Sequence, residues 1–74
     1  MEVLTTEPSL VVYTAGYASG KDIGAQGVPY RAFDGIALEA QHLSDTPHHP
    51  EFPTTLLRPG QVYRATTIYG FSLR

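Results

Sequence analysis

The sequence predicts an all-β protein, and specifically a part of a β-sandwich that this chain does not complete. Short runs of β-branched and aromatic residues alternate with breaks rich in Pro and Gly, and no segment carries a helical period. About four strands without helices would form an open sheet with unpaired edges. The aromatic face of such a sheet needs a second layer to cover it. We therefore expect residues 1–74 to form one segment of a sandwich whose other strands lie elsewhere.

The first half of the chain predicts two short strands and a long loop. Residues 2–6 and 10–14 are β-rich, and they are separated by a break at Pro8, which cannot donate a hydrogen bond to a ladder. The chain therefore opens in what reads as the inside of a strand. Residues 15–28 are rich in Gly, Ala and Ser without either period, so we expect a long loop there.

The next strand, residues 35–41, carries the most informative side chain. Alternation sends Ile36, Leu38 and Ala40 to one face, and Ala37, Glu39 and Gln41 to the other. We expect the first face to belong to the core. An ionised carboxylate inside an apolar run loses solvation at a cost in free energy, and folding alone does not require that cost. Glu39 is therefore a candidate for binding or chemistry, and Gln41 shares its face.

The second half predicts an ordered loop and a final strand. Four prolines restrict the backbone of residues 42–59, and Arg58-Pro59-Gly60 has a turn pattern. Residues 61–73 then form the strongest strand pattern, and we assign its aromatic residues, Tyr63, Tyr69 and Phe71, to the core.

Composition excludes several classes of function. Five basic and seven acidic residues give a net charge of −2, without the basic cluster that nucleic acid requires. No apolar run approaches membrane-spanning length, and the N-terminus lacks the features of a signal peptide. The chain has no cysteine, which fits a reducing cytoplasm and excludes disulfides and thiolate metal sites.

Two alternative sites are weaker. His42, His48 and His49 with Glu51 suggest a metal site, but neighbouring histidines in a Pro-rich turn rarely converge on one ion. Asp45 or Glu51 would be the second carboxylate of a glycosidase, although nothing in the spacing requires that mechanism. Three aromatic residues are candidates for a wall beside a sugar ring, or for core: Tyr17, Tyr30 and Phe33.

Several motifs together resemble the C-terminal end of the aldose 1-epimerases, the galactose mutarotases. They are Tyr13-Thr14, the "LEAQ" strand at residues 38–41, the "HPEFP" loop at residues 49–53, and the "LRPG" turn at residues 57–60 with Tyr63-Arg64. The resemblance extends from about Val3 to Ser72. It implies a large antiparallel β-sandwich that interconverts the α and β anomers of hexoses such as galactose and glucose, without metal or organic cofactor.

The resemblance also implies roles for individual residues. Glu39 would be the general base on the anomeric hydroxyl, and it is the one catalytic residue that maps onto this chain. Beside it we expect Gln41, Phe33 and Tyr13 to contact the sugar, with Gln41 either orienting Glu39 or remaining a surface amide. The general-acid histidine and other sugar-holding residues belong to a part of the family sequence that this chain lacks. A missing N-terminal portion, or self-association through open sheet edges, is therefore the expected partner, and a non-catalytic carbohydrate-binding or self-associating module is the alternative function.

Two positions depart from the family pattern. Many members read Gly-Asn after the Tyr-Thr pair, where this chain has Ala15-Gly16. Many also carry a sugar-contacting glutamine at the position of Val11. We expect the first change to alter the loop and the second to remove one hydrogen bond to the substrate.

Overall fold

The computed structural model describes residues 1–73 and confirms the all-β class. These residues form three antiparallel strand pairs and no α-helix. No helix among them is long and apolar enough to cross a membrane. The pairs are β1 (Glu2–Thr5) with β6 (Thr67–Gly70), β2 (Ser9–Tyr13) with β5 (Ala37–Gln41), and β3 (Ser19–Ile23) with β4 (Pro29–Arg31). A single turn of 3₁₀ helix, η1, spans Thr46–His48.

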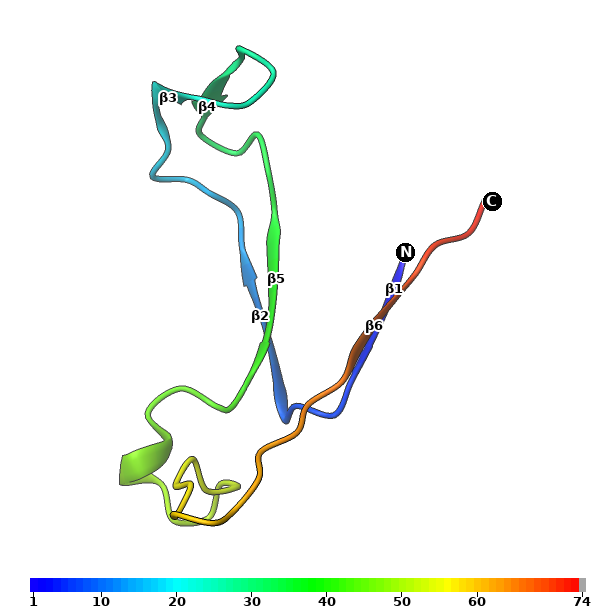
Figure 1. Ribbon diagram of the computed structural model, residues 1–74. Helices are drawn as coiled ribbons and strands as arrows, with labels where there is room; N and C mark the ends of the chain where they lie inside the picture. Colours follow the sequence, from blue (N-terminus) through cyan, green and yellow to red (C-terminus); the bar gives the residue numbers. More distant parts are fainter. Residues whose placement is uncertain (74) are drawn as a thin grey trace.

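The β2/β5 ladder is the middle of the molecule, and the β3/β4 hairpin continues from one of its ends (Figure 1). Its register runs from Ser9 opposite Gln41 to Tyr13 opposite Ala37. At the Tyr13 end the chain turns at Ala15 and at Phe33, and the Phe33 amide donates to the Ala15 carbonyl at 3.4 Å. That bond closes the ladder before the hairpin begins.

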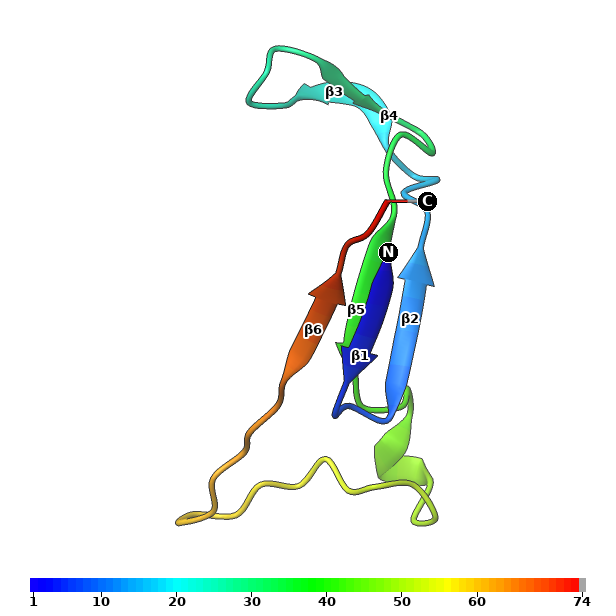
Figure 2. The same cartoon turned by 90° about the vertical axis from the view of Figure 1, so that its right-hand side faces the viewer.

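The predicted strand at residues 61–73 is too long, because β6 comprises only Thr67–Gly70. Its sole partner among the described residues is β1, which has four residues, and the pairing ends one step later where the Thr6 amide donates to the Thr66 carbonyl at 3.1 Å. Residues 61–66 have a strand-like composition, but most of them lack a neighbouring strand to pair with. Figure 2 shows this segment leading away from the paired strands toward the lower loop.

The predicted loop at residues 15–28 is also wrong in part, because it contains β3. The β3/β4 hairpin is closed by the Gly24 amide, which donates to the Val28 carbonyl at 2.9 Å, and its register is irregular between Ser19 and Ile23. Gly27 has a φ of 75°, a left-handed conformation that glycine adopts freely. Pairing with β4 therefore makes a strand of residues whose own β-propensity is low.

The predicted loop at residues 42–59 is confirmed and contains η1. The Thr46 hydroxyl donates to the Leu43 carbonyl, and Thr46 is 5% exposed, which makes it the one buried residue in the described part of the chain. The Arg58-Pro59-Gly60 turn is confirmed as well, because the Gln61 amide donates to the Arg58 carbonyl at 3.0 Å and Gly60 has a φ of 84°.

The predicted core does not exist within residues 1–73, where no hydrophobic residue is buried. Ile36 is 64% exposed, Leu38 and Ala40 are half-buried, and the aromatic residues assigned to the core are exposed: Tyr63, Tyr69 and Phe71. The Cα radius of gyration is 16.7 Å, against about 11 Å for a compact domain of this length. Three two-stranded ladders without a covering layer fit a fragment of a larger sandwich.

Candidate active site

One face of the β2/β5 ladder gathers three of the four predicted site residues. In an antiparallel pair, residues directly opposite each other point to the same side, and alternate residues share a face. Tyr13 lies opposite Ala37, Glu39 lies opposite Val11, and Gln41 lies opposite Ser9. We call these six residues the site face. Glu39 is at its centre, and a tyrosine ring and a carboxamide stand two residues away along the ladder.

Glu39 is exposed, so the expectation that its carboxylate is desolvated is wrong for this chain. The reason is the absence of a covering layer, since Tyr13 on the same face is also exposed. Val11 lies directly across the ladder, where paired Cβ atoms are about 4.5–5.5 Å apart. An apolar side chain therefore stands beside the carboxylate at the position where a polar one would reach the same ligand.

Phe33, the fourth predicted residue, lies beyond the end of the ladder. Its φ is 64°, a conformation that L-residues other than glycine rarely adopt. The ring lies against Gly16, where an added Cβ would be 3.0 Å from Phe33 Cε1. Ala15 also has a positive φ, of 56°. Two strained residues that bond to each other thus hold the Phe33 ring against Gly16, beyond the Tyr13 end of the ladder.

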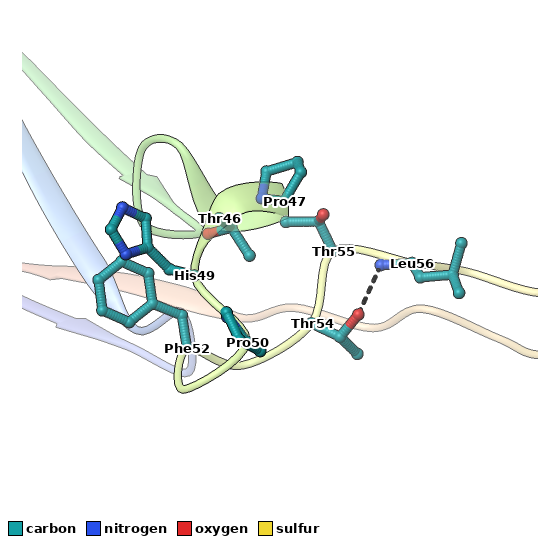
Figure 3. A pocket seen from close by; sticks show the side chains of 8 residues that line it. All are labelled: Thr46, Pro47, His49, Pro50, Phe52, Thr54, Thr55 and Leu56. Atoms are coloured by element: carbon teal, nitrogen blue, oxygen red, sulfur yellow. Dashed lines mark hydrogen bonds between the residues drawn. The ribbon is translucent and has the colours of Figure 1, made fainter.

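The three principal hollows in the described part of the chain lie away from the site face. The largest has a volume of about 510 Å³ and is formed by the loop around η1 (Figure 3). Its lining residues are Thr46, Pro47, His49, Pro50, Phe52, Thr54, Thr55 and Leu56. The second is lined by residues of β1 and β6 and the residues beside them, and the third by His42, Thr55, Leu57 and Tyr63. The site face is open, and enclosing a ligand on it requires a second layer of protein.

The histidines of the loop bond to carboxylates. Asp45 contacts His48 Nδ1 at 2.5 Å and His49 Nε2 at 3.3 Å, and Glu51 contacts His49 Nδ1 at 3.0 Å. The His49 ring also stacks on Phe52 with 4.7 Å between ring centroids. No group of three or more potential metal ligands forms among residues 1–73. These contacts order the loop.

A cluster that the sequence did not reveal lies at the other end of the ladder. Glu7, in the break between β1 and β2, accepts a hydrogen bond from the Tyr63 hydroxyl, and its second oxygen lies 3.2 Å from His42 Nδ1. The Glu7 side chain is only 5% exposed. The hydrogen bond that Tyr63 donates to Glu7, together with desolvation and the negative charge of Glu7, raises the pKa of Tyr63 above its ordinary value. The three residues are far apart in sequence, so only the pairing of the strands could have indicated them.

Known proteins that resemble this chain are sugar epimerases. The profile of the aldose 1-epimerase family matches residues 1–70. Galactose mutarotases from Mus musculus and Homo sapiens are each 40% identical over 73 residues, which cover 99% of this chain and 21% of the relative. Aldose 1-epimerase from Escherichia coli is 39% identical over 74 residues, covering 96% of this chain and 21% of the relative.

The chain spans about a fifth of the length of the curated relatives that it matches. The match nevertheless includes every strand that forms the site face and the loop that follows it. Since the family profile covers nearly the whole chain, the chain belongs to the aldose 1-epimerase family.

Proposed function

We propose that this chain supplies the C-terminal part of an aldose 1-epimerase active site, with Glu39 as the general base. The observation that carries the proposal is the register of the β2/β5 ladder, which places Glu39 between Tyr13 and Gln41 on one face. Substrates would be hexoses such as galactose and glucose. The absence of cysteine supports a reducing, cytoplasmic location.

The proposed reaction needs one base and one acid. The Glu39 carboxylate takes the proton from the anomeric hydroxyl while an acid delivers a proton to the ring oxygen, and the C1–O5 bond breaks to leave the open-chain aldehyde. Rotation about the C1–C2 bond and reversal of both transfers give the other anomer. Each positioned acid or base contributes about 10²–10⁴-fold to the rate. The acid is proposed to lie on a portion outside this chain, where the family places a histidine.

The remaining site residues bind the substrate in this proposal. Gln41 offers both hydrogen-bond donors and an acceptor to sugar hydroxyls, and the Tyr13 hydroxyl offers one of each. Phe33, beyond the Tyr13 end of the site face, presents an exposed aromatic ring to the apolar face of a pyranose. Val11 offers no hydrogen bond, so the sugar would lose one contact beside Glu39.

Polarimetry on freshly dissolved α-galactose tests the proposal. The 74-residue chain is assayed alone and mixed with Escherichia coli aldose 1-epimerase truncated before its matching segment. Rapid mutarotation is expected only in the mixture, and Glu39→Gln should reduce it by about 10²–10⁴-fold. The matched control is Glu51→Gln, which changes a loop carboxylate bonded to His49. Full activity of the chain alone, or of the Glu39→Gln mixture, would contradict these roles.

A non-catalytic module is the second candidate, and the unpaired strand edges favour it. Within residues 1–73 each strand pairs with a single partner, so every ladder keeps two free edges that another chain can extend. This function predicts galactose binding or self-association without turnover. Calorimetry with galactose and sedimentation at several concentrations distinguish it, since a monomer that binds no hexose would rule it out.

A further inference from the structure

The best-buried carboxylate in the described part of the chain is not the proposed base. The Glu7 side chain is 5% exposed, whereas Glu39 is exposed and residues 1–73 include no buried hydrophobic residue around which to organise a core. Burying a carboxylate costs free energy unless it is paired and hydrogen-bonded. Because this small, open chain nevertheless buries the Glu7 carboxylate, we expect the contacts of that carboxylate to be important for the structure.

The partners of Glu7 come from the ends of two different ladders. Tyr63, which donates to Oε1, precedes β6, and His42, at 3.2 Å from Oε2, follows β5 directly. The His42 and Tyr63 rings also lie together, with 5.9 Å between centroids. Glu7 Oε2 has no hydrogen bond of good geometry, so the 3.2 Å contact with His42 Nδ1 is the contact that offsets its burial. Glu7 thus joins the β1/β6 ladder to the β2/β5 ladder at the junction where β1 leads into β2.

The pattern of apolar and polar side chains specifies the register of the β2/β5 ladder only weakly. A shift of one residue moves every side chain of a strand to the opposite face, and a strand resists this shift when one face is apolar and the other polar. In β2 both faces are apolar: Leu10 and Val12 point to one side, and Val11 and Tyr13 to the other. None of the four is fully buried. Only β5 distinguishes the two faces, with Leu38 and Ala40 on one side and Glu39 on the other, and its apolar residues are only half-buried. The hydrophobic pattern therefore opposes only weakly a shift that would carry Glu39 off the site face.

The ladder also stops early at this end. Continuing the register beyond Ser9 and Gln41 would bring Pro8 opposite His42, and proline has no N–H to donate. The Glu7–His42 contact begins at this point, so a side-chain contact replaces the missing backbone bond. Polar contacts that are buried can define a register better than they add stability.

We propose that Glu7, held between His42 and Tyr63, is a positioning residue that sets the register of the β2/β5 ladder and so keeps Glu39 on the site face. Glu7 itself touches no substrate. The role of Glu39 as a base rests on the proposed function. The register of the β2/β5 ladder is measured without any sugar, so a failure of this proposal can be distinguished from a failure of the proposed function.

Disulfide trapping tests the register, because the chain has no cysteine of its own. Leu10→Cys with Ala40→Cys reports the observed register, in which the two residues are directly opposite. Leu10→Cys with Gln41→Cys reports a shift of one residue, since in the observed register these side chains point to opposite faces and cannot bridge. The effective concentration of each pair is measured in a glutathione buffer, with and without 6 M urea as the unfolded reference.

In the parent chain the 10–40 bridge should dominate. Glu7→Ala should lower the ratio of the 10–40 bridge to the 10–41 bridge about tenfold, because it removes both the hydrogen bond from the Tyr63 hydroxyl to a charged carboxylate and the contact with His42. It should also raise the 10–41 bridge above its value in urea. Glu2→Ala, which removes an exposed carboxylate from β1, is the matched control and should leave the ratio unchanged.

Three results would overturn the proposal. One is a parent chain that shows no preference for the 10–40 bridge. Another is an unchanged ratio in Glu7→Ala. The third is a fall of both bridges to their urea values in Glu7→Ala, because this would mean that Glu7 supports folding in general and does not select the register.

Discussion

The uncovered face of the β2/β5 ladder leads to a quantitative prediction. The described chain exposes 6510 Å², whereas a compact protein of this mass exposes about 4,500 Å². The excess of about 2,000 Å² is comparable to the area buried in permanent protein complexes. Among the residues that contribute to it is Val12, which is 55% exposed on the face opposite Glu39.

Replacing Val12 with serine should therefore have little effect on the chain alone and a clear effect on its complex. Completing the burial of a side chain that is half-exposed contributes roughly 1–2 kcal/mol for valine. Val12→Ser should weaken association with the truncated Escherichia coli enzyme by roughly 5- to 30-fold, since 1.4 kcal/mol is a factor of ten. Val28→Ser, in the turn of the β3/β4 hairpin, is the matched control and should weaken association less.

Calorimetric titration of the two portions measures this effect, and small-angle scattering of the chain alone checks its premise. The free chain should have a radius of gyration of 16.7 Å or more, and its ladders should unfold separately, without one cooperative urea transition. A dilute monomer with a radius of gyration near 11 Å and cooperative unfolding would refute the reasoning, because such a chain would have a core of its own. Equal losses for Val12→Ser and Val28→Ser would refute the assignment of the covered face.

Three further predictions follow from single contacts. Glu7→Gln should lower the pKa of Tyr63 toward its ordinary value, as measured by phenolate absorbance with Tyr63→Phe as the blank. Because folding raises this pKa, the contribution of Tyr63 to the stability of the fold is complete below about pH 10 and is lost as the pH rises through the folded pKa. Ala15→Gly should stabilise the Tyr13 end of the ladder by up to about 1 kcal/mol, because glycine adopts the positive φ of 56° without strain. The greater conformational entropy of glycine in the unfolded chain offsets part of this gain. Slower amide exchange in β2 would support the prediction, and faster exchange would contradict it. A double-mutant cycle with Thr5→Val and Thr67→Val, measured by amide exchange in β1 and β6, should give a coupling of about 0.2–1 kcal/mol between hydroxyls that lie 3.1 Å apart. A coupling of zero would indicate that β1 and β6 do not pair in solution.

Local chemistry made several features readable from the sequence. The break at Pro8, the strand that carries Glu39 and the turn at Gly60 were each predicted from residues close to one another in the chain, and the structure places all three as expected. The shared face of Glu39 and Gln41 also follows from the alternation of a single strand. Periodicity, proline and glycine act over a few residues, so no tertiary information was needed.

Pairing between distant segments decided the rest. Residues 61–66 look like a strand, yet β6 is confined to Thr67–Gly70 because β1 is the strand available to it, while β3 forms from an unpromising sequence because β4 lies beside it. The exposure of Glu39 and the burial of Glu7 depend on which surfaces are covered, and a strand's own residues carry no record of that. The sequence by itself therefore determined the family and the candidate base. The tertiary structure decided where the strands end, which carboxylate is buried and which side chains lie opposite Glu39 in the ladder. The physical reason is that hydrogen-bond ladders and burial are properties of pairs of segments, and a one-dimensional pattern describes only one member of each pair.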